Sequence, residues 1–476
     1  DNFETDAMAY YLSAREITLI NATFFKTDIF EFKSDKPISL SIRDGSGIIS
    51  ATTDVNIYFS PKSEKIIINK RILEKSYKNN KTLLINIKKG YHKIRVSPSF
   101  QLKIREEQIL SKFAKKISLK KKSRTSQKGL KEVLNLNLRQ AITVVHILDL
   151  DLDGKNEILV GLADGTLLFI KDKEVIRHYK TGGKINVIKA ADIDCDGTYE
   201  VILGCQDRHL YVLNNEGDLK WRFRCPKGHL GSVGYVKYIE VVDINKDGKK
   251  EIILATGAWK IHALNFKGEQ IWEYEAYAWN PTFLHVNDVD SDGLMEIIEG
   301  NDYFFVHVVD HKGNLKWKYR TRRPVIHSST IEDLDNDGQK ELVLAVSDNC
   351  IHVLNDNGRL KTKIVLGGEP TDVKVSDLNG DGEKEIYVSS DNYYFYCLTH
   401  TGEVIWVKDM NDIVEKVLLL DKRNVIACTP HGFKLFDGKG KERACYATTE
   451  RLSYVTTNNR RILVGTCEGT LKILTM

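Results

Sequence analysis

A nine-residue acidic pattern that occurs six times constrains this chain more than any other feature of its sequence. Each copy has Asp at its first and fifth positions, Asp or Asn at its third, Gly at its sixth and Glu at its ninth. Residues one, three and five of a tight loop can point inward together, the glycine permits the bend, and the ninth residue closes the cage with oxygen. The pattern is therefore typical of a loop that wraps a hard cation. The copies are Asp149–Glu157, Asp192–Glu200, Asp243–Glu251, Asp288–Glu296, Asp333–Glu341 and Asp377–Glu385.

The spacing of the copies predicts the fold. Successive copies begin 43, 51, 45, 45 and 44 residues apart. Each is followed by an apolar segment such as Glu251–Thr256, then by a second such segment, a glycine turn and a segment that often carries Trp. A period in the forties with four short strands per unit is the signature of a β-propeller blade.

Two units without the acidic loop complete the array. Lys416–Phe436 and Leu452–Leu474 keep the apolar strands but carry no acidic pattern. The last unit has only three strands, and Glu132–Leu138 can supply its missing fourth. We therefore predict an all-β chain with an eight-bladed propeller over residues 132–476, closed by this N-terminal strand, with seven blades as the alternative. Closure would remove the exposed sheet edges of an open array.

The first 105 residues carry no acidic repeat. Short β-branched runs such as Ile17–Phe25, Ile38–Arg43 and Val55–Phe59 are separated by turn residues. This pattern predicts a small antiparallel β-sandwich over residues 1–105. The sandwich loosely resembles accessory domains of polysaccharide lyases, and the segment carries no catalytic motif.

Residues 106–131 are predicted to form a basic linker. Between Ser111 and Glu132 there are nine Lys or Arg residues and one acid. No nucleic-acid motif accompanies this run and only Phe113 interrupts it, so we interpret it as a solvated connector and expect no nucleic-acid partner.

Composition narrows the class of protein. The chain has 476 residues, 42% of them hydrophobic, and no apolar run of 18 or more, so we expect no membrane insertion. The eight cysteines form no CxxC pair, which favours buried free thiols. Six divalent ions would raise the formal charge from +5 to +17 and favour anionic partners. The chain begins at Asp1 without a leader, so we expect a processed or trimmed product, with a further domain upstream as one possibility.

The loops and their strands resemble FG-GAP or VCBS repeats, the calcium-binding blades of integrin α subunits, several lectins and some polysaccharide lyases. The resemblance implies up to six calcium ions and an extracellular or cell-surface location. It also implies side-chain ligands at the first, third, fifth and ninth loop positions, with a backbone carbonyl from the seventh. Glu at the ninth position and Asn at two third positions depart from many relatives. The implied ligands are Asp149, Asp151, Asp153, Glu157, Asp192, Asp194, Asp196, Glu200, Asp243, Asn245, Asp247, Glu251, Asp288, Asp290, Asp292, Glu296, Asp333, Asp335, Asp337, Glu341, Asp377, Asn379, Asp381 and Glu385.

The blade ends also resemble the tryptophan-docking repeat of quinoprotein propellers. Four glycines each precede a Trp by four residues, as in Gly313 and Trp317. We expect these indoles to dock one blade on the next. No quinone-binding constellation accompanies them.

In the resembled family the calcium loops join the first and second strands at one end of the ring. The opposite end then consists of the second-to-third turns and the blade connections, where propeller ligands usually gather. The longest connection, Cys225–Tyr235, falls on this face. Aromatic, amide and Arg side chains there suit sugars and carboxylates. The ligand-binding candidates are Arg208, His209, Trp259, Trp279, Asn280, Tyr303, Asn349, Tyr393 and His431.

The first functional hypothesis is a secreted or surface-displayed, calcium-stabilised propeller that binds a polysaccharide or another glycan, including anionic ones. The alternative is a polysaccharide lyase or glycoside-degrading enzyme on the same face. A lyase needs a carboxylate neutraliser and a base, roles that suit these residue types. Protein–protein adhesion is a third hypothesis without residue support. The catalytic candidates are Arg322, Arg323, His327, Tyr303 and His229.

Overall fold

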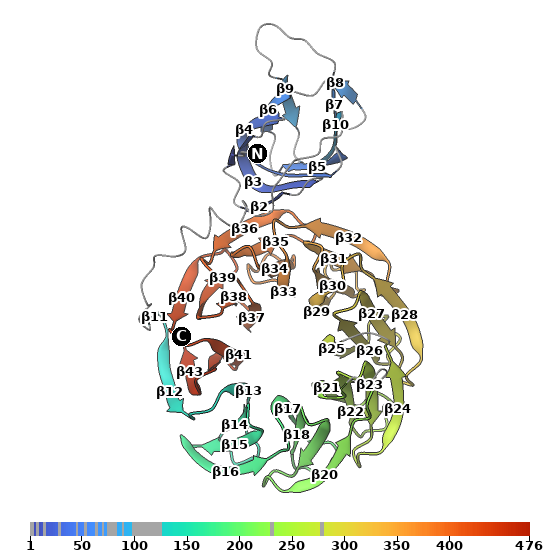
Figure 1. Cartoon of the computed structure of the whole chain (residues 1–476), viewed down its shortest axis with the longest axis vertical. Helices are drawn as coiled ribbons and strands as arrows, with labels where there is room; N and C mark the ends of the chain where they lie inside the picture. Colours follow the sequence, from blue (N-terminus) through green and yellow to red (C-terminus); the bar gives the residue numbers. More distant parts are fainter. Residues whose placement is uncertain are drawn as a thin grey trace.

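The computed structural model describes residues 126–228, 233–276 and 280–476, and, within residues 1–97, the backbone of ten strands. No helix occurs in these described parts of the chain, so the all-β prediction is confirmed. The residues from 132 onward form a ring of eight sheets around a common axis (Figure 1). The prediction of eight blades is therefore confirmed, and the seven-bladed alternative is wrong.

The N-terminal strands lie where the apolar runs predicted them. They pair antiparallel in the order β1-β3-β4-β5-β10-β7-β8, with β2 on β3 and with β6 between β4 and β9. The packing of two sheet faces into a sandwich depends on side chains outside the described residues. The strands are β1 (Glu4–Thr5), β2 (Ala9–Leu12), β3 (Glu16–Lys26), β4 (Phe30–Arg43), β5 (Ser46–Ala51), β6 (Val55–Pro61), β7 (Lys65–Ile68), β8 (Arg71–Leu73), β9 (Leu83–Ile87) and β10 (Gly90–Ser97).

Blades one to six are four-stranded antiparallel meanders of consecutive strands, each ordered from the axis outward. Blade one is β13 (Ile142–Leu148), β14 (Glu157–Leu162), β15 (Thr166–Lys171) and β16 (Glu174–Lys180); blade two is β17 (Ile185–Ala191), β18 (Glu200–Cys205), β19 (His209–Leu213) and β20 (Leu219–Arg224); blade three is β21 (Val236–Val242), β22 (Glu251–Thr256), β23 (Lys260–Leu264) and β24 (Gln270–Glu275). Blade four is β25 (Pro281–Asn287), β26 (Glu296–Asn301), β27 (Phe305–Val309) and β28 (Leu315–Arg320); blade five is β29 (Ile326–Glu332), β30 (Glu341–Val346), β31 (Cys350–Leu354) and β32 (Leu360–Val365); blade six is β33 (Pro370–Ser376), β34 (Glu385–Ser390), β35 (Tyr394–Leu398) and β36 (Val404–Asp409).

The last two blades close the ring with strands from the beginning of the propeller. In blade eight, β12 (Lys131–Asn137) pairs with β43, with Leu136 opposite Leu471, which confirms the predicted closing strand (Figure 1). In blade seven, β11 (Ser126–Lys128) adds a fifth strand to β40. We did not anticipate β11, which lies inside the stretch predicted as a linker. The strands are β37 (Lys416–Asp421), β38 (Asn424–Thr429), β39 (Gly432–Asp437) and β40 (Glu442–Ala447) in blade seven, and β41 (Leu452–Asn458), β42 (Arg461–Thr466) and β43 (Thr470–Thr475) in blade eight.

The core lies between blades. All six residues are buried in each of β18, β22, β26, β30 and β34, because both faces of these second strands are covered by neighbouring blades. One cluster joins Val343 and Val353 of blade five to Val373 and Val388 of blade six. Burial of such side chains contributes roughly 1.5–3 kcal/mol each.

The four indoles dock neighbouring blades as predicted. Trp317 donates its indole N–H to the carbonyl of Asp356 in the next blade at 2.9 Å, and Trp221, Trp272 and Trp406 make equivalent bonds. The glycine of the next blade's outer turn lies against the ring, so that a Cβ on Gly358 would come within 2.5 Å of Trp317. Glycine is therefore required beneath each indole for close packing.

Polar side chains link the innermost strands. Asp372 is 6% exposed and accepts hydrogen bonds from Ser328 in blade five and from the backbone N–H of Val417 in blade seven, the latter at 2.9 Å. One buried carboxylate thus connects three blades around the axis.

Candidate functional site

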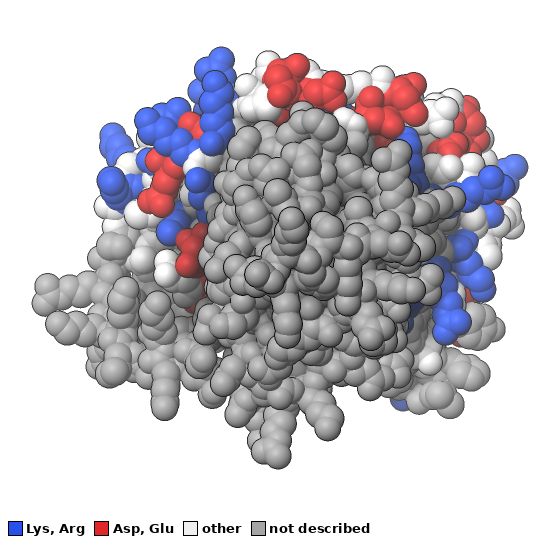
Figure 2. Space-filling model, turned by 90° about the horizontal axis from the view of Figure 1, so that it is seen from above, with Lys and Arg blue, Asp and Glu red and all other residues white. Residues whose placement is uncertain are grey.

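All six acidic loops join the first and second strands of their blades and share one hydrogen-bond scheme. In the first loop, Asp149 accepts the N–H of Gly154 at 2.8 Å, Asp153 accepts that of Lys155 at 2.9 Å, and Glu157 accepts that of Leu150 at 2.8 Å. The equivalent bonds recur in every copy. Clusters of Asp and Glu stand along one rim of the propeller in Figure 2. The chain's own amides therefore shape these loops.

The remaining oxygens of the loops suit a hard cation. In the first loop, carboxylate oxygens of Asp149, Asp151 and Glu157 lie within 4.8 Å of one another, and at least three other loops repeat this arrangement. Oδ1 atoms of Asp194, Asp288 and Asp335 are buried without a hydrogen-bond partner. Oxygen clusters of this kind are what calcium binds. The residues present therefore fit the ion that the sequence implies.

Burial affects the ninth-position glutamates. It raises the pKa of Glu200, Glu251, Glu296 and Glu385, and hydrogen bonds from neighbouring side chains and from the loop backbone oppose this rise only in part. A positive charge beside each of these carboxylates would stabilise its ionised form.

Four loops already hold a positive charge that the sequence analysis missed. The ammonium of Lys316 lies 3.0 Å from Glu296 and 2.5 Å from Asp290 of its own blade. Lys220 and Lys361 make the equivalent contacts in blades two and five. Burial works against the charge of Lys316, but these two hydrogen bonds prevail and raise the pKa of its ammonium above the ordinary value. The signal was visible in the sequence, because each of these lysines comes directly before the position that holds Trp221, Trp317 or Thr362 in its blade.

The first loop receives its lysine from a different strand. Lys171, the last residue of β15, lies 2.7 Å from Asp151, 2.9 Å from Asp153 and 2.6 Å from Glu157. Hydrogen bonds to these three carboxylates raise the pKa of the ammonium.

In the third and sixth loops no described lysine pairs with the carboxylates at the ligand positions, and an amide donates to them instead. Asn245 donates to Asp247 and Glu251, each at 3.2 Å. Asn379 donates in the same way to Asp381 at 2.9 Å and to Glu385. These are the two loops with Asn at the third position.

The opposite end of the ring carries a repeated backbone feature. The second-to-third turns of blades two to six each place a residue other than glycine at positive φ, between 62° and 74°. Blades one and eight use Gly165 and Gly469 at positive φ in these turns. A bulky residue in this conformation costs about 1–2 kcal/mol relative to glycine. The five residues are Arg208, Trp259, Phe304, Asn349 and Tyr393.

Four of these five residues were predicted as ligand-binding candidates, and Phe304 was missed. Tyr303, its neighbour, was predicted instead and is 43% exposed. Each of the five precedes a central Tyr or His of the third strand by three residues, a spacing that aligns Phe304 with Tyr393. Alignment of the turns on that position would have found it.

Several other candidates hold the turns together. Arg208 donates to the carbonyl of Cys225 at 2.8 Å, and His209 contacts Asp207. Asn280 bonds Tyr235 at 2.5 Å and also Asp302. These contacts use most of their polar atoms, although Nε of Arg208 is buried without a hydrogen-bond partner. His431 is exposed and lies 3.8 Å from Asp412, while Trp279 and His229 lie outside the described residues.

The contacts of the catalytic candidates within the described part of the chain do not connect these residues with one another. Arg322 and Arg323 are exposed and make no side-chain ion pair within the described part of the chain. His327 pairs with Glu369 at 2.5 Å. These contacts do not connect the neutralising Arg and the base that a lyase requires.

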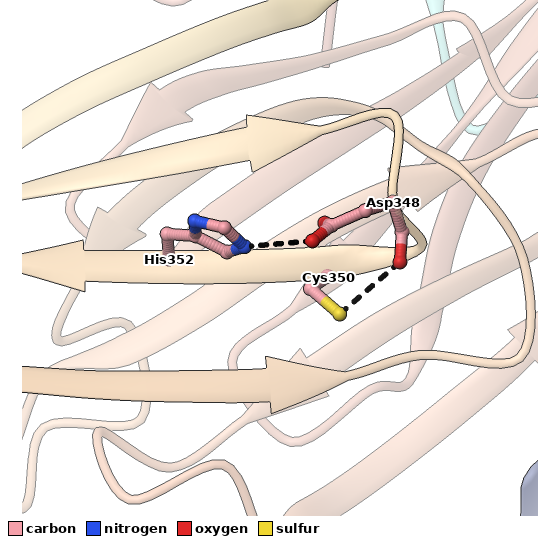
Figure 3. A group of neighbouring side chains, drawn as sticks. All are labelled: Asp348, Cys350 and His352. Atoms are coloured by element: carbon pink, nitrogen blue, oxygen red, sulfur yellow. Dashed lines mark hydrogen bonds and ion pairs between the residues drawn. The ribbon is translucent and has the colours of Figure 1, made fainter. Parts of the chain in front are cut away.

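Asp348, Cys350 and His352 are close enough to hold a metal, but hydrogen bonds already link them (Figure 3). His352 bonds Asp348 at 3.1 Å and Tyr319 at 2.9 Å, and Cys350 donates to the carbonyl of Asp348 at 3.2 Å. Burial raises the pKa of the Cys350 thiol. Blade two has a hydrogen-bonded Asp207–Tyr211 pair at the positions of Asp348 and His352. We therefore interpret the group as a structural contact that holds the blade together.

The remaining cysteines are free thiols, as expected. Five of the eight are buried, but Cys195 and Cys467 are exposed. Cys195 lies within the second acidic loop and not in a strand, which corrects the expectation of uniformly buried thiols.

A basic pocket that the sequence analysis missed lies on the acidic-loop side, where blades seven and eight lack the acidic pattern. It has a volume of about 950 Å³ and is lined by Lys422, Arg423, Arg460 and Arg461 together with Asp421. The charge of this face therefore changes sign at the two degenerate blades.

Comparison with known proteins supports the repeat assignment. Residues 333–388, which contain the fifth acidic loop and the strands around it, match the model of the FG-GAP-like repeat. This chain is a β-propeller that contains an FG-GAP-like repeat. The match lies in blades five and six, and the same loop geometry recurs in blades one to four.

Solved structures support the fold of this FG-GAP-type propeller. The computationally designed Ika8 protein matches with a TM-score of 0.58 at 13% identity, over 73% of this chain and 100% of that one. BamB from Moraxella catarrhalis matches with a TM-score of 0.55 at 15% identity, over 73% of this chain and 100% of that one. Sqt1 of Saccharomyces cerevisiae gives 0.58 at 9% identity, over 72% and 98%. Among curated proteins, none matches. At these identities the likeness concerns the fold alone.

Within the described residues, no helix has the length and apolar character needed to cross a membrane.

Proposed function

We propose that this FG-GAP-type propeller is a binding protein that recognises a polysaccharide on the face formed by its second-to-third turns. The observation that carries the proposal is the set of five strained turn residues, Arg208, Trp259, Phe304, Asn349 and Tyr393. Strained backbone persists where the surrounding structure or a function requires the side chain, and it clusters at binding sites. Glycine would relieve the strain, as it does in blades one and eight.

The chemistry of these residues favours a sugar ligand. Trp259, Phe304 and Tyr393 present aromatic rings, which stack on pyranose faces, and Asn349 carries an amide that can pair with hydroxyls. The side chains of Trp259, Asn349 and Tyr393 make no hydrogen bond to any described residue. Their polar atoms are therefore available to a ligand.

Charge favours an acidic polysaccharide. Arg322 and Arg323 stand exposed in the connection between blades four and five, which belongs to the same face. Arg pairs carboxylates in a bidentate manner. The proposal also includes calcium ions in the acidic loops, where they would stabilise the opposite face. It further includes a location outside the cell, because millimolar calcium there fills loops of this kind.

The test is a glycan array and titration with immobilised uronate polysaccharides. We expect the wild-type chain to bind and the Trp259→Gly and Tyr393→Gly variants to lose at least about fivefold in affinity, since a stacked aromatic contact contributes roughly 1 kcal/mol or more. Because glycine relieves the backbone strain, the thermal midpoint of the variants should fall little or rise.

A matched control is Lys173→Gly, which also replaces a residue at positive φ by glycine but lies in the third-to-fourth turn of blade one, outside the five turns. Retained binding by both glycine variants, or binding to no polysaccharide by the wild type, would refute the proposal. Release of unsaturated uronate products, detected by ultraviolet absorbance, would instead identify a lyase.

A further inference from the structure

A β-bulge at the same place in every outer strand of blades one to six determines which side chain faces the acidic loop. In blade two the register is Val212 opposite Trp221 and Leu213 opposite Leu219, so that Lys220 is the extra residue. A bulge re-aims the side chain of its extra residue. Here it directs the ammonium of Lys220 to within 2.8 Å of Glu200.

The residue at this bulge differs between blades in step with the loop. It is Lys in blades two, four and five, whose loops have Asp at the third position. It is Ile271 in blade three and Ile405 in blade six, whose loops have Asn at the third position. Both isoleucines are nearly half exposed, at 49% and 45%.

Blade one supports the same relation by a different route. Its bulge residue is Ile176, yet its loop has Asp151 at the third position. Lys171 reaches that loop from the neighbouring strand β15 and contacts three of its carboxylates. The ammonium is thus present whenever the loop has four carboxylates, whichever strand supplies it.

The formal charge of the side chains at loop positions one, three, five and nine, counted together with the ammonium that contacts them, is consequently the same in all six loops. Four carboxylates and one ammonium carry a net charge of −3, and so do three carboxylates with an Asn and no ammonium. In the lysine loops the nitrogen lies 2.5–3.1 Å from oxygens of the third and ninth residues. Calcium would need the same oxygens at about 2.3–2.6 Å, so an ammonium and the ion compete for one place.

We infer that Lys171, Lys220, Lys316 and Lys361 are built-in counter-ions that hold four loops closed without a metal, and that calcium must displace them there, so that the third and sixth loops take calcium first. This inference rests on the calcium part of the proposed function and divides the six equivalent loops into two classes. In the asparagine loops no ammonium has to leave, and Asn contributes its carbonyl oxygen once the amide turns.

Calcium titration of the chelator-treated full chain by calorimetry tests the division. We expect the wild type to bind two ions tightly and any others about tenfold more weakly, a difference equivalent to an ion pair of ordinary strength. Replacing all four lysines by Met, which keeps most of the apolar stem, should raise the number of tight sites to six. The reciprocal Ile271→Lys/Ile405→Lys variant should lose the two tight sites.

Thermal unfolding in chelator provides the second readout. Lys316→Met should unfold at a lower temperature than the control Lys312→Met, because Lys312 is exposed in the adjacent turn and makes no side-chain ion pair with any described residue. Equal midpoints for these two variants, or equal filling of all six wild-type loops, would overturn the inference. If no variant binds calcium while Lys316→Met still unfolds early, the calcium part of the proposed function fails and the counter-ion role stands.

Discussion

The contact between Gly358 and Trp317 provides a quantitative test of how the blades dock. In the Gly358→Ala variant, the new methyl group would lie 2.5 Å from Cε3 and 2.7 Å from Cδ2 of Trp317. Carbon atoms do not approach so closely, and the indole cannot withdraw freely because its N–H is bonded to Asp356 at 2.9 Å. We expect this overpacking to lower the free energy of unfolding by about 1–3 kcal/mol.

A second contribution comes from the backbone. Gly358 has φ of +78°, where an alanine costs about 1–2 kcal/mol. The Gly338→Ala variant isolates this contribution, because Gly338 has φ of +89° and no atom lies within 4 Å of its added Cβ. The change in unfolded-state entropy from Gly to Ala is the same in both variants and cancels from their difference.

Urea unfolding followed by circular dichroism measures the two variants. We expect Gly358→Ala to lose roughly 2–5 kcal/mol and Gly338→Ala roughly 1–2 kcal/mol. The difference should appear as a lower midpoint at an unchanged slope. Equal losses would show that the indole does not pack tightly against the glycine and would refute the docking argument.

Three further predictions concern single residues. Trp317→Phe should lose about 1 kcal/mol or slightly more with the indole hydrogen bond, measured by urea unfolding, with no loss contradicting its role. Asp372→Ala should lose about 1–3 kcal/mol, because the N–H of Val417 is left buried without an acceptor; a thermal midpoint equal to wild type would contradict this. Burial and the nearby Lys374 lower the pKa of His285 to about 4. The contribution of His285 to the free energy of unfolding is therefore complete above pH 6.5, and it falls by at most about 3 kcal/mol as the pH drops toward 4. Between pH 7 and pH 4.5, the free energy of unfolding should fall less for His285→Gln than for wild type. An equal fall in both proteins would refute this role of His285.

Much of the fold followed from the sequence because the blade is a local unit. The acidic loop, the glycine turn and the Trp recur at similar distances, so the period predicted the first six blades, and the apolar strands of two further units predicted the last two. The closing strand was also predictable, because the last unit had only three strands and the segment Glu132–Leu138, before the first blade, could supply the fourth. The short β11 was not, since nothing in its sequence distinguishes a strand from a basic connector.

The candidate site was predicted in part. The positions of the six loops and four of the five strained turn residues came from the repeat, because equivalent positions in equivalent blades occupy one face. Phe304 was missed because a single turn was read without aligning it to the others. The lysines were missed because a contact between Lys316 and Glu296 depends on a bulge in a different strand, and period counting carries no information about where a bulge directs a side chain.

The sequence by itself determined the kind of blade and the chemistry of the acidic loops, since these depend on residues close together in the chain. It predicted eight blades with seven as the alternative, and the tertiary structure decided for eight. Only the tertiary structure decided how each loop is balanced. Strands separated by about twenty residues bring Lys220, Lys316 and Lys361 onto their loops, while Lys171 reaches the same place from another strand. Six loops that look alike in sequence therefore belong to two electrostatic classes, because a charge is neutralised by whatever lies nearest in space, wherever it lies in the chain.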